Sequence, residues 1–166
     1  MTETKTITLT SLFAGLIFIF TAYISHIPTG VGYVHFGDAF IYLAACLLPR
    51  KYAMMAAAIG AGLADIATGG MLWVLPTIII KPCLVAMFSR DCNMLAKRNI
   101  IACVVAGIFG VLAYFVAEVI IFGNYAVAVA NFASGFIQPV GSMIFFILIA
   151  TALNGLKIGV KNDNTL

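Results

Sequence analysis

Six apolar segments, separated by short polar breaks, constrain the fold of this chain more than any other feature of its sequence. A bilayer core about 30 Å thick needs roughly 20 apolar residues per helix, so a chain of 166 residues allows about six helices and short loops. Hydrophobic residues make up 63% of the chain and charged residues only 9%, which excludes the composition of a soluble domain. We therefore expect one all-α integral membrane domain over residues 1–166. Its six predicted transmembrane helices span about residues 7–27, 36–48, 52–69, 72–89, 99–123 and 133–155.

The basic residues predict the orientation of this bundle, because lysine and arginine in short loops concentrate on the cytoplasmic side of a membrane. The loops expected at residues 28–34, 69–71 and 123–132 contain no lysine or arginine. Eight of the nine basic residues fall on the other side: Lys5, Arg50, Lys51, Arg90, Lys97, Arg98, Lys157 and Lys161. Both termini are therefore expected in the cytoplasm, with the protein in the cell membrane.

Ionisable side chains inside the predicted helices indicate a functional site, because each costs about 2.5–3.5 kcal/mol to insert into a bilayer. Asp38, Asp65, Lys81 and Glu118 all fall at the midplane or in the outer half of the membrane. His35 lies three positions before Asp38. Aromatic and polar residues at helical spacing share faces with these groups. The resulting candidate substrate-binding residues are His35, Asp38, Tyr42, Asp65, Trp73, Thr77, Lys81, Tyr114, Glu118, Asn131 and Gln138.

The charge balance of these candidates favours a particular ligand. Three acids and one lysine cannot all be ionised cheaply at membrane depth, so either one acid is protonated or the ligand supplies donors or positive charge. Together with the aromatic residues, this predicts a neutral or weakly basic heteroaromatic ligand. The alternative is a purely structural set of interhelical ion pairs and hydrogen bonds, for example between Lys81 and one of the acids.

Small residues near the start of the chain predict a close helix contact. Ser11, Ala14 and Gly15 lie at spacings that let two helix backbones approach. The contact could be with a helix of the same chain or with a partner subunit. An alanine and glycine run over residues 56–64 should likewise be enclosed by neighbouring helices.

Several kinds of chemistry have no signature here. The four cysteines form no Cys-x-x-Cys pair, which makes disulfides and zinc improbable, and we expect neither a metal nor a cofactor. Nucleotide-binding loops, metalloprotease motifs and nucleophile elbows are absent from the sequence. The chain is not expected to be an enzyme or to bind nucleic acid, and any ATP-driven step would need another subunit.

Several of these motifs together resemble the substrate-binding S components of energy-coupling factor (ECF) vitamin transporters, in the riboflavin-type branch. The resemblance is densest at residues 35–41, 48–52, 64–70 and 73–81. It implies a six-helix bundle that captures a vitamin or precursor from outside. It also implies docking through the first helix onto a transmembrane scaffold subunit coupled to two ATPase subunits, with Ser11 and Gly15 at the positions of the family's Ala-x-x-x-Ala motif. Hydroxymethylpyrimidine or pyridoxine is the expected ligand, with riboflavin as the alternative.

Two other functions are compatible with parts of the sequence. An intramembrane aspartyl protease would use Asp38 and Asp65, since paired carboxylates can share a proton and activate water. The first of these follows Phe36 and Gly37, with His35 where such a motif would need glycine. A structural subunit with no ligand of its own is the other alternative.

Overall fold

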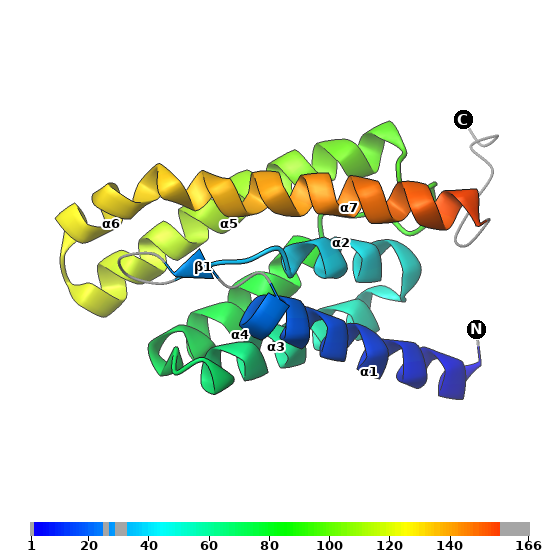
Figure 1. The fold of residues 1–166 in the computed structure, drawn as a ribbon, viewed down its shortest axis with the longest axis horizontal. Helices are drawn as coiled ribbons and strands as arrows, with labels where there is room; N and C mark the ends of the chain where they lie inside the picture. Colours follow the sequence, from blue (N-terminus) through cyan, green and yellow to red (C-terminus); the bar gives the residue numbers. More distant parts are fainter. Residues whose placement is uncertain (1, 25–26, 29–32, 157–166) are drawn as a thin grey trace.

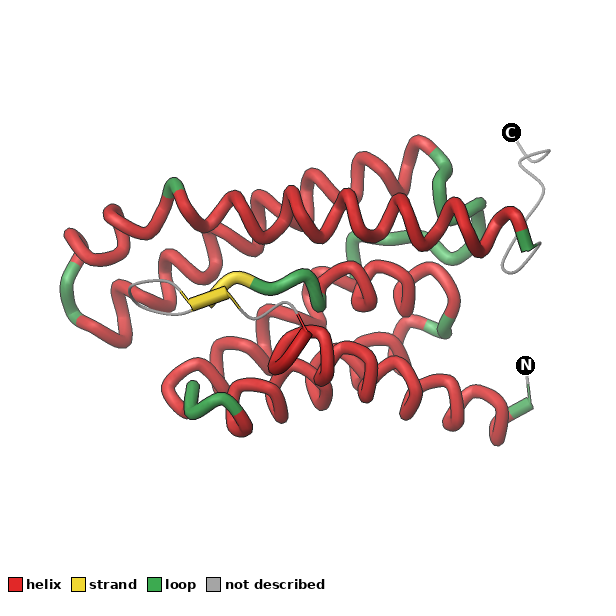
Figure 2. Tube along the Cα trace, in the orientation of Figure 1, coloured by secondary structure: helices red, strands yellow, loops and turns green. Residues whose placement is uncertain are grey.

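The computed structural model describes residues 2–24, 27–28 and 33–156, and their secondary structure is almost entirely helical (Figure 2). The helices are α1 (Glu3–Ile19) with a π-helical extension η1 (Phe20–Ile24), α2 (Asp38–Leu47), α3 (Arg50–Ala67), α4 (Met71–Val85), α5 (Lys97–Phe122), α6 (Tyr125–Phe132), the 3-10 turn η2 (Ser134–Phe136) and α7 (Ile137–Gly155). Two short strands, β1 (Ile27–Pro28) and β2 (Tyr33–Val34), pair antiparallel before α2.

The centre of the bundle is α2. In Figure 1, α5 and α7 lie on one side of α2, with α1, α3 and α4 on the other. α2 contacts α1, α3, α4 and α7, and nine of its residues are buried. Its 10 residues extend only about 15 Å, roughly half of a bilayer core. A short helix enclosed in this way places its first residue, Asp38, inside the molecule.

The alanine and glycine residues of α3 are enclosed as expected, and they allow α3 to lie close to two neighbours. A Cβ atom on Gly60 would lie 2.5 Å from the carbonyl oxygen of Ala14 in α1, and one on Gly62 would lie 2.8 Å from Ile78 in α4. The opposite face of α3 is open, since Met55, Ile59 and Leu63 are about half exposed. α3 is therefore enclosed on one face only.

The start of α1 and the end of α7 lie at the same end of the bundle, called the terminal end below, as Figure 1 shows. The opposite end is formed by the α3–α4 and α5–α6 turns. The first is closed by Gly69 at φ 81°, with the amide of Gly70 donating to the carbonyl of Asp65, the pattern of a Schellman cap. The second is closed by Gly123 at φ 60°, followed by Asn124, whose side chain accepts from the amide of Ala126 and caps α6.

The helix bounds differ from the prediction at four places. The segment 123–132 was predicted as an external loop, but most of it forms α6, because Asn124 starts a new helix directly after Gly123. The second helix is shorter than predicted, as is the fourth, which ends at Val85. The first helix begins at Glu3 and ends at Ile24. Of the rest of its predicted span, residues 25–26 lie outside the described residues and Ile27 belongs to β1.

Within the described residues, three helical stretches are long and apolar enough to cross a membrane: Glu3–Ile24, Lys97–Phe122 and Ala128–Gly155. α2 and α4 are apolar but shorter. Large apolar side chains point outward on the long helices, including Ile120 at 75% exposure and Leu148 at 62%. Such a surface is stable in lipid rather than in water, so the structure is that of a multi-pass membrane protein, while the count of six spans stays a prediction.

Candidate functional site

The eleven candidate binding residues predicted from the sequence all border one cavity of about 160 Å³. They come from the segment before α2 and from α2, α3, α4, α5, α6 and α7: His35, Asp38, Tyr42, Asp65, Trp73, Thr77, Lys81, Tyr114, Glu118, Asn131 and Gln138. Polar groups that are costly in lipid are thus collected where they can be satisfied by each other or by a ligand. Their part in binding stays a prediction that geometry alone does not test.

The cavity contains a buried ion pair between Asp38 and Lys81. The Lys81 Nζ atom lies 2.7 Å from Oδ1 and 3.0 Å from Oδ2 of Asp38, and the Gln138 Nε2 atom donates to Oδ2 at 2.8 Å. Asp38 and Lys81 are 4% and 2% exposed. Because the three side chains come from α2, α4 and α7, this cluster joins both sides of the bundle across the cavity. The ion pair is also the kind of interhelical contact, between Lys81 and an acid, that the sequence analysis gave as the alternative to ligand binding.

An aromatic wall continues from this cluster along α4 and α5. The Lys81 Nζ atom lies 5.2 Å from the ring centroid of Tyr114, within range of a cation–π contact. The hydroxyl groups of Tyr114 and Thr77 are hydrogen-bonded at 2.9 Å. Trp73 lies next along α4, with its ring 6.0 Å from that of Tyr114. The four-residue spacing of Trp73, Thr77 and Lys81 therefore does place them on one face of α4, toward α5.

His35 connects the site to α1. Its Nδ1 atom accepts a hydrogen bond from the amide of Gly37 at 3.1 Å and lies 3.5 Å from the Thr21 hydroxyl group in η1. Because Nδ1 accepts from the Gly37 amide, the ring proton belongs on Nε2. The π-helical extension of α1 and the first turn of α2 are thus linked through this imidazole beside the cavity.

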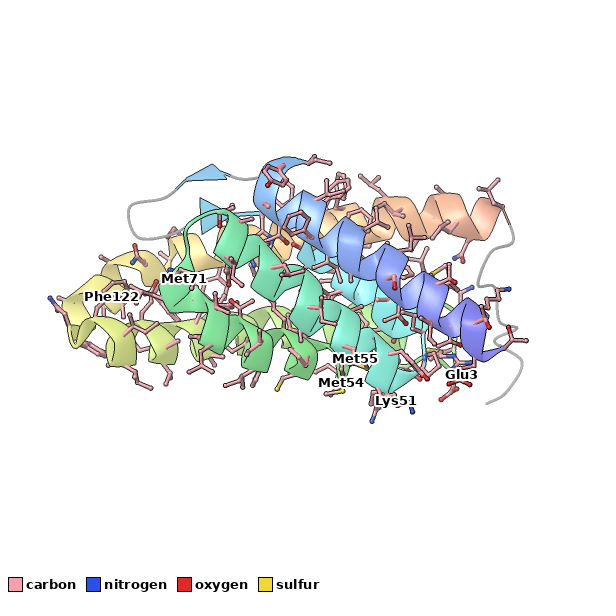
Figure 3. The ribbon with its side chains drawn as sticks, turned by 90° about the horizontal axis from the view of Figure 1, so that it is seen from below. Glu3, Lys51, Met54, Met55, Met71 and Phe122 are labelled. Atoms are coloured by element: carbon pink, nitrogen blue, oxygen red, sulfur yellow. The ribbon has the colours of Figure 1, made fainter. Side chains whose placement is uncertain are left out.

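Two further acids border the cavity nearer the end opposite the termini. Asp65 is 4% exposed in the last turn of α3, and Glu118 lies in the last two turns of α5. Figure 3 shows the adjacent helix ends, labelled at Met71 and Phe122, far from Glu3 at the terminal end of the bundle. The cavity therefore has the ion-pair cluster around Asp38 in its interior and further acidic groups toward the α3–α4 and α5–α6 turns.

Sequence reasoning missed part of the cavity wall. Phe115 and Phe132 line it, with their rings 5.5 Å apart, as do Gly107 and Gly110 of α5. The glycines do carry a signal, because residues 107, 110, 114 and 118 follow one helical face.

The predicted docking residues line a second hollow, an apolar groove of about 430 Å³ between α1 and α3. Ser11 is exposed, and a Cβ atom on Gly15 would meet nothing within 4 Å. The close contact with α3 is made instead by the backbone of Ala14 against Gly60. Ser11 and Gly15 are therefore not used in packing within the described chain, whereas Ala14 is.

The described residues offer no group of three histidine, cysteine or acidic side chains arranged to hold a metal ion. The cavity could instead hold an organic ligand, since it combines an aromatic wall with a few directed polar groups.

Comparison with known proteins points to one family. The profile described as ECF-type riboflavin transporter, S component, matches residues 1–156. An uncharacterized protein in the gap 3′ region of Pyrococcus woesei is 33% identical over 121 residues, which cover 71% of this chain and 80% of that protein. The profile match extends over every helix that borders the cavity.

Proposed function

This chain belongs to the ECF-type riboflavin transporter S component family, and we propose that the cavity around Asp38 and Lys81 is where it binds a small vitamin or vitamin precursor. As a member of that family, it is the substrate-binding subunit of a vitamin-type transporter that works with an energising module. The observation that carries the proposal is the cavity of about 160 Å³, in which a buried polar cluster faces an aromatic wall. The ligand enters from outside and is released inward when partner ATPases drive the subunit.

The size of the cavity favours a ligand with one ring. A protein cavity of about 150 Å³ is sufficient for benzene. The cavity here, at about 160 Å³, matches a substituted pyrimidine or pyridine better than the three fused rings of riboflavin. Hydroxymethylpyrimidine or pyridoxine is therefore our preferred ligand. Riboflavin is the second candidate, because the family description names it.

The charges favour a ligand that is neutral or weakly basic. The cavity lining contains three acids, Asp38, Asp65 and Glu118, but only one lysine, Lys81, which pairs with Asp38. A protonated ring nitrogen, an amino group or a hydroxyl group of the ligand can donate to these carboxylates, while an anionic ligand would be repelled. The ring itself can stack against Trp73 or Tyr114.

The ligand can be identified by its effect on a single fluorophore. Trp73 is the one tryptophan of the chain and it lines the cavity, so ligand binding should change its emission. Purified protein would be titrated with hydroxymethylpyrimidine, pyridoxine, riboflavin and phosphate esters of these compounds, with calorimetry as a second readout. Mass spectrometry would identify any compound that copurifies. Tight binding of a one-ring compound is expected, and a preference for the phosphate esters would contradict the proposal.

The Trp73→Phe variant provides the control for this titration. It should lose the fluorescence change but keep calorimetric binding, since phenylalanine still offers a ring for stacking. A protein that binds none of the compounds and copurifies with nothing would favour a purely structural subunit.

The cavity also bears on the protease alternative. A catalytic pair of aspartates needs two carboxylates that share a proton and a water molecule. Both Asp38 oxygens instead accept hydrogen bonds from Lys81 or Gln138. This arrangement supports a role for Asp38 in binding rather than in proteolysis.

The groove between α1 and α3 is our proposed docking surface for the energising module. Exposure of Ser11 and the open space beside Gly15 support it, because small residues on a lipid-facing helix let another helix approach closely.

A further inference from the structure

We propose that the groove between α1 and α3 binds one acyl chain of an anionic phospholipid whose headgroup lies at the terminal end of the bundle. This lipid would occupy the groove whenever no other helix does. The inference concerns the protein alone in a bilayer, so it stands independently of the ligand in the cavity and of docking to a partner.

The shape of the groove fits an acyl chain. Its floor consists of small residues of α1, among them Ser11 and Gly15, and its walls include Phe18, Met55 and Ile59. It runs along α1 from residue 7 to 18 and along α3 from residue 52 to 63. Eleven helical steps on each side correspond to about 16 Å, close to one leaflet of a bilayer core about 30 Å thick. The groove is thus about as long as one leaflet is deep.

The groove is also suited to hold the chain rather than merely contact it. The surrounding lipid tails are as apolar as the groove, so the hydrophobic effect does not drive an acyl chain into it. The chain gains instead from van der Waals contact with lining residues of both α1 and α3, more than the surface of a single helix provides. A hollow of about 430 Å³ left without such contacts would be unfavourable.

Charge at one end of the groove specifies the headgroup. The Lys51 Nζ atom lies 5.0 Å from the ring centroid of Tyr52, which lines the groove. Lys5, Arg50 and Lys51 are exposed at the starts of α1 and α3, against Glu3 as the one acid of those two first turns. Figure 3 shows Lys51 and Glu3 at the same end, with Met55 further along α3. Basic residues next to a membrane attract anionic lipid headgroups.

Native mass spectrometry of the full chain can test this site. The protein would be equilibrated with phosphatidylglycerol and phosphatidylcholine that carry identical acyl chains, and the retained lipids counted. We expect one phosphatidylglycerol to be retained in preference to phosphatidylcholine. Gly15→Leu should abolish its retention by filling the groove, while Gly155→Leu should not, although both glycines have no neighbour within 4 Å of the added Cβ atom.

The headgroup contact has its own matched pair of variants. Lys51→Gln should reduce the preference for phosphatidylglycerol about fivefold, the effect of one cation near a membrane surface. Lys97→Gln removes an exposed cation at the start of α5, a helix that does not line the groove, and should leave the preference unchanged. Equal retention of both lipids by the natural protein would overturn the headgroup assignment.

A phospholipid with a photoactivatable group in its acyl chain locates the site independently of retention. We expect crosslinks in α1 and α3, at residues such as Ser11 and Met55. Crosslinks spread over α5 and α7 would overturn the proposal. So would a disulfide-linked dimer of the Ser11→Cys variant, because it would mean that a second copy of the chain occupies the groove. Trp73 fluorescence reports ligand binding separately, so the two proposals can fail independently.

Discussion

At the scale of single residues, Asp38 connects its own helix to two others at the cavity. It accepts hydrogen bonds from Lys81 and Gln138 and begins the helix at the centre of the bundle. Removing one partner of a buried ion pair leaves the other charge uncompensated, which is far more costly than removing both. Comparing single and double variants therefore distinguishes a structural role of the pair from a role in ligand binding.

We predict that Lys81→Met and Asp38→Asn each lower the free energy of unfolding by about 3–5 kcal/mol. The double variant should recover most of this loss, because neither charge then stays buried without its partner. Thermal unfolding followed by circular dichroism measures the stability of each protein. Ligand affinity should be lost in all three variants. A double variant that is stable and still binds normally would mean that the pair serves only to hold the helices together.

The residues that border the cavity were predictable to different degrees. Lys81, Asp65 and Glu118 were recognisable because charge at membrane depth is costly and requires a reason. Phe115 and Phe132 were not, because an aromatic residue that faces a cavity has the same sequence pattern as one that faces lipid.

At the scale of helices, the contact between α1 and α3 depends on which glycine lies where. Gly60 has the backbone of Ala14 and the side chain of Ile17 against it, while Gly15 has no neighbour. Both are inside helices and neither has a positive φ, so they differ only in the space around them.

We expect opposite effects from the same substitution at these two positions. Gly60→Ala should destabilise the protein by about 1–3 kcal/mol, because the added methyl group forces α1 and α3 apart. Gly15→Ala should stabilise it by up to about 1 kcal/mol through higher helix propensity. Thermal unfolding of both variants under the same detergent conditions provides the comparison. Equal effects would contradict the close contact at Gly60.

Helix existence was easier to predict than helix boundaries. Apolar length identified every long helix, but α6 was missed, since residues 123–132 contain no charged residue and begin with Gly123 and Asn124, which are typical of a loop. These two residues do end α5, yet Asn124 also caps the next helix. The short length of α2 was equally hidden, because a helix enclosed by protein need not span the bilayer.

At the scale of the whole molecule, the groove and the cavity lie on different parts of the bundle, and their functions should be separable. We predict that Ser11→Leu and Gly15→Leu reduce vitamin uptake by cells about tenfold or more, which corresponds to roughly 1.4 kcal/mol of docking energy. Ligand binding by the purified variants should be unchanged. Gly155→Leu serves as the control in the same uptake assay, and normal uptake by the first two variants would exclude this docking surface.

The distribution of charge over the two ends leads to a prediction about orientation. Within the described residues, Lys5, Arg50, Lys51, Arg90, Lys97 and Arg98 belong to helix starts and the α4–α5 connection at the terminal end, while Lys157 and Lys161 lie outside the described residues. The α3–α4 and α5–α6 turns carry no lysine or arginine. By the positive-inside rule the terminal end faces the cytoplasm, and the cavity then lies nearer the outer surface.

Cysteine labelling of intact cells measures this orientation directly. Cys83 and Cys92 would first be replaced by serine, while Cys46 and Cys103 are buried and can remain. Tyr125→Cys, at a position 65% exposed beside the α5–α6 turn, should react with a membrane-impermeant maleimide from outside. Lys97→Cys should react only after the membrane is permeabilised. The reverse pattern would place the acidic end of the cavity in the cytoplasm, and because an importer must meet its ligand outside, it would contradict the proposed direction of transport along with the orientation.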